Sequence, residues 1–226
     1  MKLILNNKAN LTLEEAKKYE KQIRKYDIIV LPTTCYLSLF QKGKYILGSQ
    51  DISEFKENNR TGEINGYQLE SLNVKYCLIG HSERRVYKEE KEKIIINKIR
   101  RCSENNIIPL YCIGDINDGK KEEKIKEQID LLMNNYKKED VYIVYEPLNN
   151  IGNPNPTLDT LENTVLFIKE YIKEQYNKNI NLIYGGGVNQ ENIKSLIEIK
   201  EIDGLIISTE SLKINKLKVL YEETRK

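Results

Sequence analysis

Short apolar segments alternate with longer amphipathic segments along the whole chain. The short segments are rich in Ile, Val, Leu and Tyr, which is typical of buried strands, and the longer ones repeat apolar residues at helical spacing. Strands are predicted at 2–5, 27–31, 44–47, 76–79, 107–113, 141–145, 180–184 and 205–207. Helices are predicted at 12–25, 67–72, 83–105, 120–136, 157–176, 189–200 and 211–224, with a short helix or turn at 33–41. This pattern indicates the α/β class.

Strict alternation of strands and helices predicts parallel strands joined by right-handed crossovers. Two architectures fit this order: an open doubly wound sheet and a closed (β/α)8 barrel. The open sheet would need a glycine-rich phosphate loop after its first strand, and Asn6, Asn7 and Lys8 stand there instead. The eight predicted strands favour the parallel barrel, and 226 residues lie near the compact end of its size range. Because no linker interrupts the chain, we expect residues 1–226 to form a single barrel domain.

The balance of charges excludes several classes of protein. Lys and Arg number 36 against 34 Asp and Glu, a net charge of +2, which argues against a nucleic-acid-coating protein and an acidic disordered tail. No apolar run approaches the roughly 20 residues of a membrane span, and the run at 3–5 is too short for the core of a signal peptide. We therefore expect a cytoplasmic protein that binds neither nucleic acid nor membranes.

The cysteines and the single histidine argue against a metal centre. Cysteines stand at positions 35, 77, 102 and 112, so none forms a C-x-x-C pair. One histidine excludes a zinc site built on several histidines. We expect no bound metal and four reduced thiols buried in the core.

Residues suited to chemistry follow several of the predicted strands. In a parallel barrel the active site lies at the carboxyl ends of the strands. Lys8 follows the first strand, His81 the fourth and Glu146 the sixth. Loops of small residues at 185–187 and 208–209 follow the seventh and eighth strands, where such barrels often bind phosphate. An amine, an imidazole and a carboxylate are therefore expected around one mouth of the barrel, beside a phosphate site.

These three groups suit proton transfer next to a carbonyl group. A carboxylate removes the proton, an imidazole donates a hydrogen bond to the carbonyl oxygen, and an ammonium stabilises the negative charge that develops. His81 stands directly before a predicted helix, whose amide donors and dipole disfavour the charged imidazolium. We therefore expect His81 to stay neutral, with a pKa well below the ordinary value of about 6.5.

Several segments of the chain resemble triosephosphate isomerases. The match is most specific at 80–85, where six consecutive residues (GHSERR) agree with the family motif after the fourth strand. Tyr145-Glu146-Pro147 resembles the motif around the family's catalytic base. Further matches are Asn6-x-Lys8, Thr61-Gly62-Glu63, Cys112-Ile113-Gly114-Asp115, Ile151-Gly152 and Tyr184-Gly185-Gly186-Gly187-Val188. They follow the family's order along nearly the whole chain.

The resemblance implies the interconversion of dihydroxyacetone phosphate and glyceraldehyde 3-phosphate without a cofactor, a step of glycolysis and gluconeogenesis. Glu146 would shuttle the proton, His81 would polarise the carbonyl oxygen and Lys8 would hold the charge of the substrate. Asn6 would orient the substrate, and Glu83 would support the Lys8 region from behind. The other substrate-binding residues that we expect are Gly152, Gly186, Gly187, Ser208 and Thr209.

The resemblance also implies partners. The small-molecule partner would be a sugar phosphate. Loop 58–63 resembles the segment that inserts into a second subunit in the family. We therefore expect a homodimer, with a tetramer as the alternative.

Three departures from the family pattern affect the phosphate end of the site. Gly187 stands where the family usually has serine, and Ser208-Thr209 replace a frequent Gly-Gly pair. The lid at 149–156 carries two prolines, which restrict the backbone and change how the lid would move. Backbone N–H groups or the Ser208 hydroxyl would then bind the phosphate.

These departures leave two alternative functions open. One is a related isomerase that acts on a four-carbon ketose or aldose phosphate. The other is a non-enzymatic barrel that binds a sugar phosphate or a protein. The retained Lys8, His81 and Glu146 argue against the second alternative, because binding alone requires no base.

Overall fold

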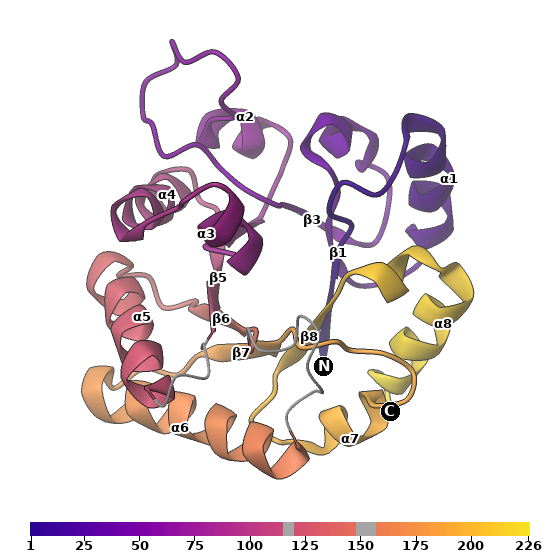
Figure 1. The fold of residues 1–226 in the computed structure, drawn as a ribbon. Helices are drawn as coiled ribbons and strands as arrows, with labels where there is room; N and C mark the ends of the chain where they lie inside the picture. The colour runs from indigo at the N-terminus through magenta and orange to yellow at the C-terminus, as the bar shows by residue number, and fades with distance from the viewer. Residues whose placement is uncertain (115–119, 148–156) are drawn as a thin grey trace.

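The structure is a closed barrel of eight parallel strands surrounded by helices (Figure 1). It is a computed structural model and describes residues 1–114, 120–147 and 157–226. The strands are β1 (Lys2–Asn6), β2 (Ile29–Leu31), β3 (Ile46–Ser49), β4 (Tyr76–Ile79), β5 (Ile108–Ile113), β6 (Tyr142–Tyr145), β7 (Asn181–Tyr184) and β8 (Gly204–Ile207). Each strand pairs with the next, and β8 pairs with β1. The predicted (β/α)8 barrel is therefore confirmed, and the open sheet is excluded.

Helices follow the strands around the ring and cover the outside of the barrel (Figure 1). They are α1 (Leu13–Ile23), α2 (Gly66–Ser71), α3 (Ser82–Tyr87), α4 (Glu92–Glu104), α5 (Lys121–Asn135), α6 (Leu158–Tyr176), α7 (Ile193–Glu198) and α8 (Ile214–Glu223). In the described part of the chain, the short 3-10 helices η1 (Thr34–Leu39) and η3 (Thr209–Leu212) follow β2 and β8. Each thus starts at the carboxyl end of its strand, at the mouth of the barrel.

Alternate residues of each strand face the barrel interior and the surrounding helices. In β6, Tyr142 and Val144 pack inside the barrel, whereas Ile143 and Tyr145 pack against the helices. One more residue in the same alternation places the side chain of Glu146 inside, at the carboxyl end. The period of two therefore directs this carboxylate into the mouth of the barrel.

Local signals in the sequence explain how α1 begins. The Thr12 hydroxyl accepts a hydrogen bond from the backbone N–H of Glu15, and a Glu15 side-chain oxygen accepts one from the Thr12 N–H at 2.8 Å. This reciprocal arrangement satisfies two backbone donors that a helix start otherwise leaves unpaired. Removing such a cap typically costs about 1 kcal/mol of stability. The predicted start at residue 12 is therefore confirmed.

The single long helix predicted at 83–105 is wrong, because the chain forms α3 and α4 with a break between them. Glu89 takes a left-handed backbone conformation in the break, with a φ of 52°. The turn brings the next residue, Glu90, back between Arg84 and Lys98, where its carboxylate is buried. Helical periodicity continues through this segment, but the buried ion pairs stop the helix.

Two other predicted helices are shorter than expected. Of 189–200, only the part in α7 is helical, and residues 190–192 form a turn. The Asn189 side chain accepts hydrogen bonds from the N–H groups of Glu191 (2.8 Å) and Asn192 (3.1 Å), as a capping residue does. The segment 211–224 contains the end of η3 and then α8, instead of one continuous helix.

Cysteine burial differs from the prediction at one position. Cys77, Cys102 and Cys112 are buried free thiols, as expected. Cys35 is also free, but it is exposed, because it lies on η1 at the surface. Among the described residues, no helix is both long and apolar enough to span a membrane.

Candidate active site

A cavity of about 360 Å³ opens at the carboxyl ends of the strands. Its wall contains these residues predicted from the sequence: Asn6, Lys8, His81, Glu146, Gly187, Ser208 and Thr209. The sequence prediction did not include Gly185, Asn189 and Glu210, which line the same cavity. Closure of the barrel therefore brings the predicted amine, imidazole and carboxylate to one mouth.

Two predicted site residues, Gly186 and Glu83, are not part of this cavity wall. A Cβ added to Gly186 would lie 2.2 Å from the Tyr184 hydroxyl oxygen. Glu83 lies behind Lys8 and lines a neighbouring cavity of about 310 Å³. Gly152 and the rest of the predicted lid at 149–156 lie outside the described residues.

Glu146 is placed by its own strand and by a glycine of the next one. Its backbone N–H donates to the carbonyl oxygen of Ile113 at 2.9 Å, which continues the pairing of β5 and β6 beyond Tyr145. A Cβ on Gly185 would lie 2.8 Å from Glu146 Cγ and 3.0 Å from its Oε1. Gly185 therefore leaves the space that the carboxylate occupies. The run of three glycines at 185–187 was the signal in the sequence for this role.

His81 caps the start of α3 and faces Glu146 across the cavity. Its Nδ1 accepts a hydrogen bond from the backbone N–H of Glu83 at 3.3 Å. Its Nε2 lies 3.3 Å from Glu146 Oε2. In the neutral ring the proton therefore resides on Nε2, because Nδ1 must supply a lone pair to the helix. The ring is held so that Nε2 donates into the cavity.

The expected low pKa of His81 is wrong, because the structure raises it. Burial lowers the pKa of His81, but the hydrogen bond to Glu146, the charge of Glu146 and the charge of Glu83 raise it, against a smaller opposing effect of Lys8. The net pKa lies above the ordinary 6.5. The prediction from the sequence considered only the helix that follows His81. It left out Glu146, whose carboxylate the barrel places next to the imidazole and which raises the pKa of His81.

A proton NMR titration checks this assignment, because His81 is the only histidine. We expect a midpoint above 6.5 for the ligand-free protein and a lower midpoint in the Glu146→Gln variant. The pKa of His81 is higher in the folded state than in the unfolded state, so the contact between His81 and Glu146 stabilises the fold. This stabilisation is complete below the unfolded-state pKa of His81, and it disappears as the pH rises through the folded-state pKa. A wild-type midpoint at or below 6.5, or no change in Glu146→Gln, would contradict the charge coupling.

Lys8 reaches the site from a strained backbone. Its φ of 49° places it in the left-handed region, which costs a residue with a side chain roughly 1–2 kcal/mol. Lys8 Nζ lies 2.5 Å from Glu83 Oε1. Strain of this kind persists where the surrounding structure imposes it, and it clusters at functional sites. The ion pair holds the ammonium beside the imidazole and supports the position expected for Glu83 behind Lys8.

The predicted phosphate end is built from Gly187 and Ser208. Gly187 has a φ of 60°, a conformation that suits glycine better than the serine usual in the family. Its carbonyl oxygen accepts a hydrogen bond from Asn192 Nδ2 at 3.0 Å, on the side of α7. Ser208 lines the cavity, and its hydroxyl is buried without a hydrogen-bond partner among the described residues. A buried hydroxyl in this state is available to a ligand oxygen.

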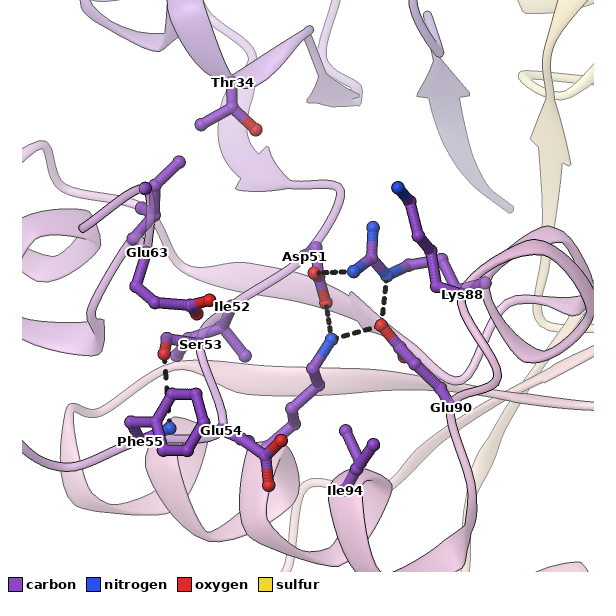
Figure 2. A pocket seen from close by; sticks show the side chains of 14 residues that line it. Thr34, Asp51, Ile52, Ser53, Glu54, Phe55, Glu63, Lys88, Glu90 and Ile94 are labelled. Atoms are coloured by element: carbon purple, nitrogen blue, oxygen red, sulfur yellow. Dashed lines mark hydrogen bonds and ion pairs between the residues drawn. The ribbon is translucent and has the colours of Figure 1, made fainter. Parts of the chain in front are cut away.

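A second polar cluster lies behind the site, next to a cavity of about 390 Å³ (Figure 2). Lys98 Nζ lies 2.6 Å from Asp51 Oδ1 and 2.5 Å from Glu90 Oε1. Arg84 contacts the same two carboxylates, at 2.6 Å and 2.5 Å. Two cations and two carboxylates thus alternate in a closed ring, which we call the buried ion cluster. Sequence reasoning missed it, because its members lie far apart in the chain.

The buried ion cluster joins the loop after β3 to α3 and α4. Lys98 and Glu90 are almost fully buried. Burial raises the pKa of Asp51, although Lys98 and Arg84 lie against its carboxylate. Arg84 belongs to the short helix that His81 caps. The cluster therefore anchors the helix whose first turn holds the imidazole.

Comparisons of the sequence with known proteins show the family of the chain. The sequence model of the family described as triosephosphate isomerase matches residues 1–224. The triosephosphate isomerase of Buchnera aphidicola subsp. Cinara cedri is 32% identical, over 97% of this chain and 95% of that protein. The chain belongs to the triosephosphate isomerase family. The triosephosphate isomerase of Clostridium botulinum is 34% identical, over 92% of this chain and 93% of that protein. The triosephosphate isomerase of Dictyoglomus turgidum is 34% identical, over 89% of this chain and 87% of that protein.

Membership of the triosephosphate isomerase family confirms the resemblance found in the sequence motifs. It identifies the chain as an isomerase, so the non-enzymatic alternative is excluded. The matched region includes Gly187 and Ser208, where the chain departs from the usual family residues. The departures at the phosphate end are therefore substitutions within the family.

Proposed function

We propose that the chain interconverts dihydroxyacetone phosphate and glyceraldehyde 3-phosphate by proton transfer through an enediolate. The observation that carries the proposal is the 3.3 Å contact between Glu146 Oε2 and His81 Nε2 in one cavity with Lys8. A base, a hydrogen-bond donor and a cation are the groups that an enediolate needs. The family membership supports the same reaction.

Each group has one part in this reaction. Glu146 is the base that removes a proton from one carbon and returns it to the other. His81 donates its Nε2–H to the carbonyl oxygen of the substrate. This role is supported by the hydrogen bond from the Glu83 N–H to Nδ1, because that bond leaves the ring proton on Nε2. Lys8 stabilises the negative charge of the enediolate and of the phosphate. Nε2 lies 3.3 Å from Glu146 Oε2, so a carbonyl oxygen bound between the two side chains would lie within reach of both the donor and the base.

The phosphate group binds where the strands β7 and β8 end. We assign its donors to backbone N–H groups around Gly187 and to the Ser208 hydroxyl. Support comes from the left-handed backbone of Gly187 and from the lack of any partner for the Ser208 hydroxyl in the described part of the chain. Oriented backbone amides in such turns form anion-binding concavities. Asn6 and Thr209 complete the wall around the substrate.

A coupled spectrophotometric assay tests the proposed reaction. Purified protein is given glyceraldehyde 3-phosphate, and formation of dihydroxyacetone phosphate is followed, with the Glu146→Gln variant from a parallel preparation as background. The same assay with erythrose 4-phosphate tests the four-carbon alternative. We expect a far higher kcat/KM for the triose. A preference for the tetrose would replace the proposed substrate with the related one.

We further propose that the active form is a homodimer built on loop 58–63. Residues 56–63 are all exposed, and the loop projects beyond α2 at the rim of the molecule (Figure 1). A cavity of about 310 Å³ beside Lys8 and Glu83 supplies a place for the loop of a second copy. Tyr87 lines this cavity and is 75% exposed. A standard interface buries about 1,600 Å² in total, and an inserted loop would form its centre.

Replacing residues 58–63 by a short Gly-Ser turn is expected to give monomers with a large loss of kcat. The physical reason is that the inserted loop would cover the side of the site next to Lys8 and hold the Lys8–Glu83 pair. Light scattering gives the mass, and the coupled assay gives the activity. Val219→Ser is the matched control, because Val219 is an exposed apolar residue of α8. A fully active monomer would contradict the proposed interface.

The cytoplasmic location and the role in glycolysis and gluconeogenesis stay predictions from the family resemblance. A tetramer stays the alternative to the dimer. Light scattering of the wild-type protein distinguishes the two assemblies by mass.

A further inference from the structure

The backbone of Lys8 is held on both sides by side chains: one from the end of its own strand β1 and two from the segments that follow β2 and β3. Its N–H donates to Asn6 Oδ1 at 3.1 Å. Its carbonyl oxygen accepts hydrogen bonds from Thr33 Oγ1 at 2.6 Å and from Gln50 Nε2 at 2.9 Å. Gln50 Nε2 also donates to the carbonyl oxygen of Leu31 at 3.0 Å, which fixes the amide itself. The left-handed φ of 49° is therefore imposed by the loops after β2 and β3.

The hydroxyl of Thr33 makes a hydrogen bond that is unusual for a residue at the start of a helix. Thr33 is the residue that caps the start of η1, where a threonine hydroxyl ordinarily accepts a bond from its own helix. It makes no such bond and donates instead to Lys8, 25 positions earlier in the chain. Thr33 does not line the candidate active site. Its hydroxyl thus serves the Lys8 backbone and neither its own helix nor the substrate.

The direction of the Lys8 side chain depends on this backbone conformation. Rotation about the N–Cα bond to the usual negative φ would turn the Cα–Cβ bond away from its present direction. The ammonium would then lose the position in which it lies 2.5 Å from Glu83 Oε1 and lines the cavity. A left-handed lysine relaxes readily unless its peptide groups are held. Two donors on one carbonyl oxygen provide that restraint.

We propose that Thr33, together with Gln50, is a positioning residue that keeps Lys8 in its left-handed conformation and so directs the ammonium into the active site. The proposal rests on the proposed function, because it assigns the ammonium to substrate charge. Thr33 acts through Lys8 alone and contacts no substrate. Loss of its hydroxyl therefore weakens the interaction of Lys8 with the phosphate and the enediolate, while Glu146 and His81 keep their places.

The test compares Thr33→Val, which keeps the shape and removes the hydroxyl, with Thr33→Ser, which keeps the hydroxyl. We expect Thr33→Val to lower kcat/KM roughly tenfold, the effect of one lost hydrogen bond near a charged group. Thr33→Ser should stay within about twofold of the wild type, within the usual scatter of such effects. The Kd of inorganic phosphate, measured by calorimetry, should rise several-fold in Thr33→Val and stay unchanged in Thr33→Ser.

A double-mutant cycle with Lys8→Ala separates positioning from general packing. In the Lys8→Ala background the ammonium is absent, so Thr33→Val should cause no further loss of activity or of phosphate affinity. An equal loss in both backgrounds would overturn the proposal, and so would wild-type kinetics of Thr33→Val. If Thr33→Val does not fold, Gln50→Met removes the second donor and carries the same expectation.

Failure of the proposed function gives a different result. A wild-type protein without triose phosphate isomerisation would overturn that function, and the phosphate measurements would still decide whether Thr33 positions Lys8. An active wild type whose phosphate affinity depends on Lys8 but not on Thr33 would overturn the positioning role alone.

Discussion

Replacing Glu146 by glutamine is expected to lower kcat by about 10²–10⁴-fold, the contribution typical of a general base. The amide has nearly the shape of the carboxylate but cannot take up a proton. The cavity, Gly185 and the hydrogen bond from the Glu146 N–H to Ile113 do not depend on the charge, so the fold and the phosphate site should persist. The coupled assay gives kcat, and calorimetry gives the Kd of inorganic phosphate.

Glu146→Asp provides the matched control for position. It keeps the charge and withdraws the carboxylate by one methylene group, and misplacement by about 1 Å can cost roughly 10²-fold in rate. We therefore expect an intermediate rate, with phosphate affinity close to that of the wild type. Unchanged turnover in Glu146→Gln would show that another group is the base. Loss of phosphate binding in both variants would show that Glu146 has a structural role instead.

Replacing Lys98 by methionine is expected to destabilise the protein by about 3–5 kcal/mol, the cost of removing one partner from a buried ion pair. The side chain is almost fully buried, and its ammonium contacts both Asp51 and Glu90. Without it, the buried carboxylate of Glu90 and the half-buried carboxylate of Asp51 share the single guanidinium of Arg84. Urea unfolding at a fixed protein concentration measures the loss.

An exposed ion pair provides the control for Lys98→Met. Lys17 lies 2.7 Å from Glu14 on the surface of α1, and such pairs contribute at most about 1 kcal/mol. Lys17→Met should therefore change the free energy of unfolding little. The deficit of Lys98→Met should shrink as the pH falls, because burial raises the pKa of Asp51 and its protonation removes an uncompensated charge. Equal effects of the two substitutions would show that the buried ion cluster adds no stability.

The parts of the fold that the sequence predicted are those with local causes. Alternation of apolar residues in β6 depends on neighbours two positions apart, and it directs Glu146 inward without reference to the rest of the chain. The cap of α1 needs only Thr12 and Glu15. Strict alternation of strands and helices then leaves few topologies, because parallel strands must be joined by crossovers of one hand. The sequence pattern alone therefore places Lys8, His81 and Glu146 at one mouth of the barrel.

The remaining properties depend on contacts between distant parts of the chain. The pKa of His81 is set largely by burial and by Glu146, and the break before α4 follows from ion pairs of Glu90 with Arg84 and Lys98. No periodicity encodes these contacts, because they arise only when the register of all strands closes the barrel.

Lys8 shows both kinds of cause, local sequence and contacts between distant segments, at a single residue. The sequence alone placed an amine after the first strand. Its left-handed conformation is imposed by Thr33 and Gln50, which reach the same carbonyl oxygen from the loops after β2 and β3. Local sequence therefore determined which chemical groups reach the mouth of the barrel. Tertiary structure decided their charge and direction, because electrostatic and hydrogen-bond partners are chosen by proximity in space and not along the chain.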